Sequence, residues 1–145
     1  MSETAAVMED RAAWIEEFFR RVDTHDFEWV ESALAQDCVI DAPGFKHEGA
    51  EVVVLWMAGF FAAFPDLRHR PHRVIAEGEE AAFLVEVTGT HTEDLAFPDG
   101  GALPPTGKSI RVELAEFWRF EGAQVVEYKV IYDQADFLGQ LGVGV

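Results

Sequence analysis

Several residue types are scarce in this sequence, and each scarcity excludes a class of protein. The only cysteine, Cys38, cannot form an internal disulfide, and it lies in an apolar run where a small buried side chain is the usual role. Basic residues number 11 against 27 acidic ones, which gives a formal net charge of -16. Because such a charge repels phosphate backbones and anionic lipids, we expect neither a nucleic-acid partner nor a membrane partner.

Long hydrophobic runs are also missing. The longest stretch without a charged side chain, residues 52–65, is shorter than the roughly 20 apolar residues of a membrane-spanning helix. Residues 1–11 are acidic and polar, unlike a signal or transit peptide, so a cytoplasmic location is expected. The histidines lack the spacing of zinc ligands, and no glycine-rich phosphate loop or Gly-x-Ser-x-Gly motif occurs. We therefore expect no metal and no cofactor.

The first half of the chain has the periodicity of helices. The 145 residues, 49% of them hydrophobic, suffice for a single domain over residues 1–145. Helical spacing predicts a first helix over residues 12–23 and a second, shorter one that starts after the N-cap Asp26 and ends near Asp37. Residues 52–64 are apolar on every side, which predicts a buried third helix.

The second half changes to the composition of strands. Segments rich in Val, Phe, Ile and Thr are separated by glycines and by a proline-rich loop, and they predict four long, mostly antiparallel strands over residues 67–76, 81–92, 109–120 and 125–132. A short helix over residues 134–141 follows. Helices first and strands afterwards indicate an α+β domain, with helices covering one face of a curved sheet.

Side-chain alternation turns two polar residues toward the inner face of this sheet, and a third lies at the end of a strand. Glu116 shares a face with Leu114 and Trp118, and the parity that turns Val87 inward also turns His91 inward. In the last strand, Tyr128 and Tyr132 belong to the apolar set. Strict alternation would turn Asp133 outward, although strands often kink at their ends.

Each polar candidate also has a purely structural explanation. Asp133 stands where an N-cap of the final helix would stand. His91 fits an interior histidine, and a buried Glu116 must be protonated, paired with an arginine or hydrogen-bonded to a tyrosine. The basic segment over residues 68–73 is divided between two sheet faces by alternation, which favours a solvated strand that balances nearby acids. The structural and functional readings both remain open at this point.

The sequence resembles the SnoaL-like polyketide cyclases, a branch of the NTF2-like superfamily, over nearly its whole length. The matching segments are Phe64-Pro65-Asp66, Gly89-Thr90-His91, Pro104-Pro105-Thr106-Gly107-Lys108, Trp118-Arg119-Phe120, and Asp133 through Gln140-Leu141-Gly142. The resemblance implies a cone-shaped fold in which three N-terminal helices pack on a curved, mostly antiparallel sheet. It further implies an enclosed apolar pocket and a homodimer formed through the outer sheet face.

The resemblance also implies an activity. In these cyclases a cofactor-free intramolecular aldol condensation closes a ring, and the family's acid and base falls on Asp133, with His91 as hydrogen-bond partner. The substrate would be a hydrophobic, carbonyl-bearing small molecule, and the reaction of the cyclase, isomerase or lyase type. The side chains expected to contact it are Trp14, Phe18, Trp56, Phe60, Glu116, Trp118, Tyr128 and Tyr132.

Departures from family patterns leave alternatives open. The tyrosine and the base of the related ketosteroid isomerases fall on Phe18 and Ala42, which argues against that isomerase chemistry, although their pocket acid falls on Glu116. Lys129 replaces a bulky aromatic residue that is common in the family. An epoxide hydrolase-type enzyme remains an alternative, as does a non-catalytic module for ligand binding or dimerisation. The module predicts that Asp133 is exposed or only capping and that no titratable pocket group is perturbed.

Overall fold

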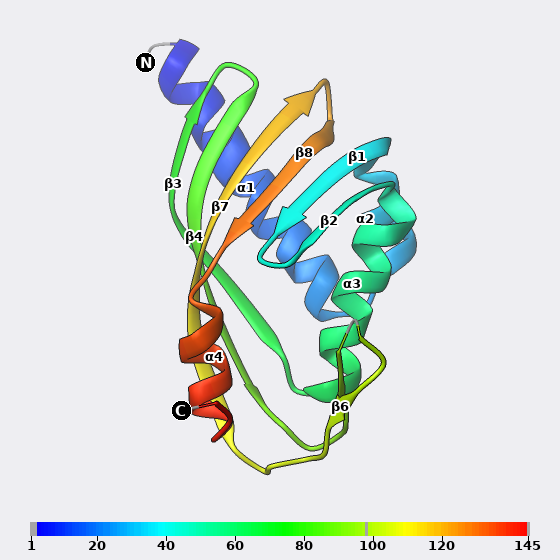
Figure 1. The fold of residues 1–145 in the computed structure, drawn as a ribbon. Coiled ribbons are helices and arrows are strands. Elements are labelled where there is room, and N and C mark those ends of the chain that lie inside the picture. The colour runs from blue at the N-terminus through cyan, green and yellow to red at the C-terminus, as the bar shows by residue number, and fades with distance from the viewer. Residues whose placement is uncertain (1–2, 98, 145) are drawn as a thin grey trace.

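The computed structural model describes residues 3–97 and 99–144 and has an α+β architecture (Figure 1). Its elements, in chain order, are α1 (Glu3–Asp23), α2 (Phe27–Ser32), β1 (Leu34–Ala42), β2 (Phe45–Glu48), α3 (Ala50–Ala63), β3 (Arg68–Glu77), β4 (Glu80–Thr90), β5 (Leu95–Ala96), β6 (Ala102–Leu103), β7 (Ser109–Glu121), β8 (Gln124–Ile131) and α4 (Gln134–Gln140).

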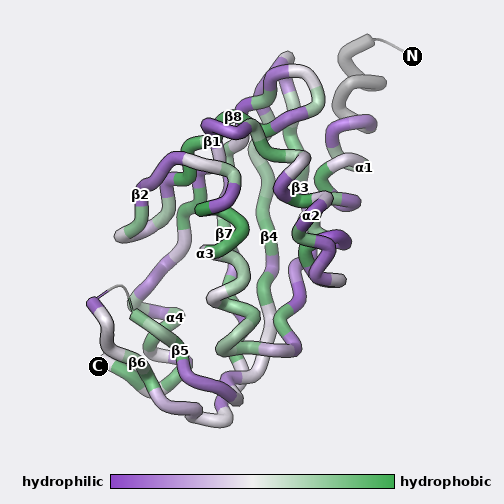
Figure 2. The backbone as a smooth tube through the Cα atoms, turned by 90° about the vertical axis from the view of Figure 1, so that its right-hand side faces the viewer, coloured by the Kyte–Doolittle hydropathy of each residue, from purple (hydrophilic) through white to green (hydrophobic). Residues whose placement is uncertain are grey.

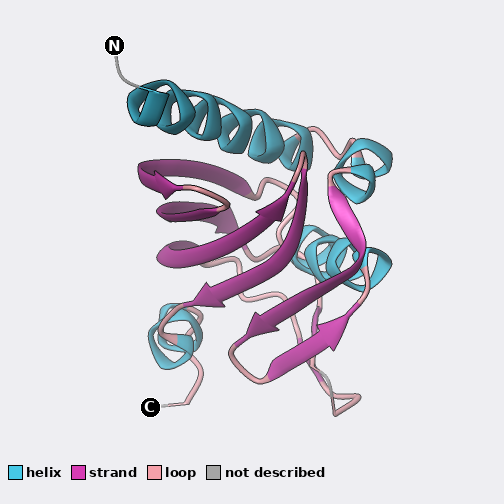
Figure 3. Cartoon of the chain, turned by 90° about the horizontal axis from the view of Figure 1, so that it is seen from above, coloured by secondary structure: helices cyan, strands magenta, loops and turns pink. Residues whose placement is uncertain are grey.

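One six-stranded sheet, in the order β2-β1-β8-β7-β4-β3, forms the frame of the molecule. Only the β1–β8 pair is parallel, and the other neighbours in this sheet are antiparallel. Viewed from above, the sheet curves, α1 runs across one end of it, and α3 lies on its concave side (Figure 3). The predicted fold class and the four long strands are confirmed.

Apolar side chains of the helices and of the concave sheet face form the core. The predicted stripe of α1 is buried, with Ile15, Phe18 and Val22 fully inaccessible to solvent. Both α3 and β4 are coloured mostly hydrophobic in Figure 2, as expected for elements buried on several sides. Within the described residues, no helix combines the length and the apolar character that crossing a membrane requires.

The second helix is shorter than the sequence predicts. Asp26 does cap α2, since its side chain accepts the backbone N–H of Trp29 at 3.3 Å. The predicted end near Asp37 is wrong, because α2 ends at Ser32 and Leu34 already pairs with Val125 of β8. These residues have helical periodicity, but they form a strand because they pair with β8, which is far away in the sequence. The strands β2, β5 and β6 are likewise absent from the prediction.

The exit from α3 is fastened to the end of β4. The Asp66 carboxylate accepts the backbone N–H of Thr90 at 2.7 Å and its hydroxyl at 2.8 Å. A Cβ atom at Gly89 would lie 3.2 Å from side-chain atoms of Phe64 and Leu67, so glycine permits this close approach. Two of the sequence segments that carry the family resemblance therefore meet at this point.

Candidate functional site

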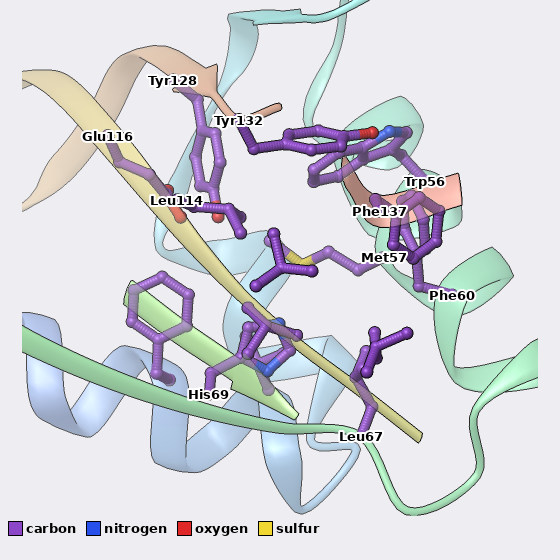
Figure 4. Close-up of a pocket in the computed structure, with 15 residues that line it drawn as sticks. Trp56, Met57, Phe60, Leu67, His69, Leu114, Glu116, Tyr128, Tyr132 and Phe137 are labelled. Atoms are coloured by element: carbon purple, nitrogen blue, oxygen red, sulfur yellow. The ribbon is translucent and has the colours of Figure 1, made fainter. Parts of the chain in front are cut away.

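A cavity lies between the helices and the concave face of the sheet. Figure 4 shows side chains from α3, β3, β7, β8 and α4 converging on it. The cavity is narrow: its volume is about 60 Å³, which is room for a few water molecules. A larger ligand must displace some of the lining. The lining is mostly apolar and consists of Phe19, Val22, Trp56, Met57, Phe60, Leu67, His69, Val87, Ile110, Val112, Leu114, Glu116, Tyr128, Tyr132 and Phe137.

Glu116 is the acid of this cavity. Alternation along β7 turns it inward between Leu114 and Trp118, as predicted, and only 1% of it is exposed. The indole N–H of Trp118 donates to its Oε1 atom at 3.0 Å. The Tyr128 hydroxyl also hydrogen-bonds to the carboxyl group, and Figure 4 shows the two groups turned toward each other. The structural explanation of a hydrogen bond to a tyrosine is thus correct.

Burial changes the protonation state of this carboxyl group. Loss of hydration disfavours the charged form and raises the pKa of Glu116 to about 8, although the hydrogen bonds from Trp118 and Tyr128 lower it in part. Burial likewise raises the pKa of Tyr128 well above its usual value. Glu116 is therefore largely a neutral carboxylic acid at pH 7. With Oε1 accepting from Trp118, the other oxygen can carry the proton and donate a hydrogen bond.

His69 is a second titratable group of the cavity lining, and the sequence analysis did not single it out. Its Nδ1 atom lies 2.7 Å from Oδ1 of Asp23, and its backbone N–H donates to Oδ2 of the same carboxylate at 2.9 Å. The ring stacks on Phe19, with 5.4 Å between ring centroids. Both side chains of the Asp23–His69 pair are largely buried, with 13% and 14% of their surfaces exposed.

The register of the sheet explains why His69 faces inward. It pairs with Val87, a residue that the sequence already assigns to the inner face. If the first two long predicted strands are paired as a hairpin, His69 falls opposite Val87 and is expected to face inward. The rest of the basic segment is the solvated strand that was predicted: Arg70 pairs with Glu86, and His72 lies 3.0 Å from Glu113.

The opposite end of the cavity is aromatic. Trp56, Phe60, Tyr132 and Phe137 line both the cavity and an outer groove of about 600 Å³ on the same measure. In Figure 4 these side chains lie across the cavity from Glu116. The narrow inner space therefore adjoins a wider apolar groove, and the four aromatic side chains separate the two.

Asp133 is not part of the cavity lining. It follows β8, is exposed, and accepts the backbone N–H of Asp136 at 2.9 Å, which makes it the N-cap of α4. Strict alternation, which turns this residue outward, is the better guide to its side chain. The family resemblance assigns the catalytic acid and base to Asp133, but in the structure its side chain caps a helix.

His91 is fully buried, as predicted, but it too lies outside the cavity lining. Its Nδ1 atom accepts the backbone N–H of Thr106 at 3.1 Å and lies 3.0 Å from the Thr106 hydroxyl. The neutral ring thus carries its proton on Nε2, which has no hydrogen-bond partner in the described part of the chain. His91 fastens the segment around Thr106 to the end of β4.

The remaining expected substrate contacts divide into two groups. Trp56, Phe60, Glu116, Tyr128 and Tyr132 line the cavity. The other three, Trp14, Phe18 and Trp118, pack on one another behind the cavity wall, with centroids 4.8 to 6.3 Å apart. Trp118 nevertheless contributes to the site, because its indole N–H donates a hydrogen bond to Glu116.

Among the described side chains, those of residues 10–97 and 99–144, no group of three or more His, Cys, Asp or Glu has an arrangement that could hold a metal ion. Burial raises the pKa of the Cys38 thiol to about 12, so this cysteine is a poor nucleophile at neutral pH. The polar side chains of the cavity lining are Glu116, His69, Tyr128 and Tyr132, which can transfer protons and form hydrogen bonds.

Comparisons with known proteins show which family the chain belongs to. No curated protein matches the sequence. Among solved structures, AclR of Streptomyces galilaeus, for which a hydroxylase activity has been suggested, is 28% identical, with 95% of this chain and 99% of AclR covered and a TM-score of 0.78. IdmH of Streptomyces antibioticus, suggested to be a polyketide cyclase, is 24% identical, with 91% and 98% covered and a TM-score of 0.75.

A third similar structure is an NTF2-like protein of Burkholderia pseudomallei whose function is unknown. It is 20% identical, with 90% of this chain and 95% of that chain covered and a TM-score of 0.72, so the likeness concerns the fold. The sequence model of the SnoaL-like domain matches residues 15–128, which is most of the chain. The chain therefore belongs to the SnoaL-like domain family.

Proposed function

We propose that this protein is a cofactor-free acid–base enzyme of the cyclase or isomerase type, acting on a hydrophobic small molecule that bears carbonyl groups. The observation that carries the proposal is a buried carboxyl group, Glu116, in the lining of an apolar cavity, where burial raises its pKa to about 8 and favours the neutral acid. A neutral acid is a strong hydrogen-bond donor to a carbonyl oxygen. In a site without bulk water, such a donor stabilises the negative charge that develops on that oxygen.

Glu116 is suited to this role by its supports. Trp118 fixes the carboxyl group through Oε1, and Tyr128 contacts it from the neighbouring strand β8. Because these contacts exist before any ligand binds, little reorganisation is needed when charge develops on the substrate. Preorganised donors of this kind contribute about 10²- to 10³-fold to the rates of enzymes that use them.

The alternatives have less support. Epoxide opening needs a water molecule held by polar groups, and neither arginine nor asparagine lines the described cavity. The non-catalytic module predicts an exposed or capping Asp133, which agrees with the structure, and an unperturbed pocket, which does not, because the pKa of Glu116 is raised to about 8. A perturbed group in an apolar cavity favours catalysis over passive binding.

Aldol ring closure and isomerisation of a carbonyl compound share their first step, which is removal of a proton from the carbon beside the carbonyl group. Glu116 would stabilise the resulting enolate in either case. An assay of that proton removal therefore tests the shared step before the final product is known.

We further propose that a second copy of the chain covers the outer face of the sheet. Phe117 and Ile131 point to this face from β7 and β8 and are 49% and 48% exposed, and Ile75 of β3 is 67% exposed. Ile75 and Phe117 both pair with Ala82, so they lie in one row across the sheet. Sedimentation should show a dimer that Phe117→Glu dissociates, and a wild-type monomer at micromolar concentration would contradict this proposal.

The catalytic proposal is tested by proton exchange. Two hydrophobic ketones that enolise, 2-tetralone and benzoylacetone, are incubated in D₂O with the protein, and loss of the α-proton signal is followed by NMR. Wild type should accelerate the exchange, and Glu116→Ala should lower the rate by about 10²- to 10³-fold. Glu113→Gln, which changes an outward acid of the same strand, is the matched control and should behave as wild type. A wild-type rate equal to that of buffer contradicts the proposal.

A further inference from the structure

The proposed reaction also needs a proton acceptor, and neither acid supplies one, because Glu116 is neutral and Asp133 lies outside the cavity lining. Among the cavity-lining side chains, only His69 offers an imidazole nitrogen. It also borders a polar surface cleft that contains Asp23. His69 therefore stands between a carboxylate near the surface and the apolar interior.

The contact with Asp23 decides which ring nitrogen is available. Asp23 accepts from Nδ1 at 2.7 Å through one oxygen and from the backbone N–H of His69 at 2.9 Å through the other. A neutral imidazole has a single N–H, and this carboxylate holds it on Nδ1. The lone pair then lies on Nε2, and stacking on Phe19 keeps the ring in place. An oriented carboxylate–histidine pair is a common arrangement for a general base.

We propose that the Asp23–His69 pair is the base of this site: Nε2 of His69 removes a proton from the carbon beside a carbonyl group, and Asp23 positions the ring. The inference rests on the proposed function and adds its second group. Asp23 is a positioning residue, because it acts through His69. A carbon acid needs a base and an oxyanion donor at separate points, and the site would then contain both.

The places of the two groups in the sheet leave room for a substrate between them. His69 pairs with Val87 and Glu116 pairs with Phe83, so the two lie on opposite sides of β4 and four residues apart along it. On a flat sheet this offset is about 13 Å along the strands and about 10 Å across them, and curvature brings the side chains closer. The α-carbon of a bound carbonyl compound can therefore lie at His69 while its carbonyl oxygen lies at Glu116.

An intramolecular aldol closure is possible with these two groups, and its atoms balance. The α-proton passes to Nε2 of His69, while the neutral Glu116 donates a hydrogen bond to the enolate oxygen and keeps its proton. The electron pair of the enolate then forms a bond to a second carbonyl carbon. The oxygen of that second carbonyl takes the proton from His69, which gives a hydroxyl group and a neutral imidazole. No electron is gained or lost overall, so no oxidant or reductant is needed.

The exchange assay separates this inference from the proposed function. His69→Gln should lower the enzyme-catalysed exchange rate by about 10²- to 10⁴-fold, and added imidazole should restore part of the rate in His69→Ala. Asp23→Asn should lower the rate less, because the ring remains present. His72→Gln is the matched control, since His72 lies on the same strand and contacts Glu113 rather than the cavity. Unfolding curves of each variant show whether the fold is retained.

A spectroscopic measurement supports the comparison. In ¹⁵N NMR spectra of wild type, the neutral ring of His69 should carry its proton on Nδ1, and Asp23→Asn should shift protons toward Nε2. If His69→Gln and His69→Ala fold and keep the wild-type rate while Glu116→Ala loses it, the inference is overturned and the proposed function stands. If wild type itself does not exceed the buffer rate, the proposed function fails, and the inference fails with it.

Discussion

Two acids, one within a strand of the sheet and one just after its last strand, have opposite environments. Glu116 lies in the middle of β7, is buried between apolar neighbours, and has a pKa of about 8. Asp133 follows the last strand, is exposed, and accepts a backbone N–H as the cap of α4. Both are carboxyl groups near aromatic residues in the sequence. Their surroundings, more than their positions in a family pattern, decide which one can donate a proton at neutral pH.

The two environments also differ in their effect on the stability of the fold. A charge at Glu116 would be desolvated, so the acid is tolerated because it is neutral and hydrogen-bonded. Asp133 is exposed to water and accepts a backbone N–H group at the start of α4. The acid within the sheet, Glu116, is therefore available for proton transfer, whereas the acid after the last strand, Asp133, stabilises a helix.

The largest expected effect is on catalysis. Glu116→Ala should lower α-proton exchange of 2-tetralone by about 10²- to 10³-fold, which corresponds to about 3 to 4 kcal/mol of lost transition-state stabilisation. Asp133→Ala should change the rate little, because its side chain does not line the cavity. Exchange rates at equal concentrations of folded protein make the test. If Glu116→Ala and Asp133→Ala lowered the exchange rate equally, the two acids would not differ in their role, which would contradict this prediction.

The next effect is on stability as a function of pH. Because the folded pKa of Glu116 is about 8 and its usual value is 4.5, the folded state binds the extra proton between these values. The contribution of Glu116 to stability is thus complete below pH 4.5 and is lost as the pH rises through 8, at up to about 1.4 kcal/mol per unit. Urea unfolding between pH 5 and 9 should show a steeper decline for wild type than for Glu116→Gln. Parallel curves would contradict the prediction.

A smaller effect is expected from the support behind Glu116. Trp118→Phe removes the indole N–H and leaves Oε1 without that donor, so the free energy of unfolding should fall by about 1 to 3 kcal/mol. Since that hydrogen bond lowers the pKa of Glu116, its loss should raise the pKa further. Trp29→Phe, the same change at a partly buried tryptophan of α2, is the control and should leave the pKa of Glu116 close to wild type.

The smallest effect concerns the cap. Asp133→Ala should lower the free energy of unfolding by about 1 kcal/mol, because the N–H of Asp136 loses its acceptor. Asp133→Asn should recover most of this loss, since asparagine is also a good N-cap. Denaturant titration of the three proteins measures the difference. A loss of several kcal/mol in Asp133→Asn would show that the carboxylate does more than cap the helix.

Local patterns predicted much of the fold. The helical stripe of α1, the alternation along β7 and the cap at Asp26 depend on neighbouring residues, and each was predicted correctly. The end of α2 was not, because the residues from Leu34 onward pair with β8, about 90 positions further along the chain. Contacts of that range leave little trace in the local sequence.

The site was predictable only in part for the same reason. Alternation along one strand placed Glu116 inward, and family likeness named the strand-end acid. Finding His69 required the register between β3 and β4 and the approach of Asp23 from the end of α1. The pKa of Glu116 depends on burial from several elements at once, which the sequence alone does not give.

The central claim is that Glu116 is a neutral acid in the resting protein. The direct test is a ¹³C NMR titration of the Glu116 carboxyl carbon in protein labelled at glutamate, with Glu116→Gln used to assign the signal. The account predicts a midpoint near pH 8, so that the group is protonated at pH 7. A midpoint near 4.5, the ordinary value, would mean that the cavity contains a carboxylate and would contradict the account.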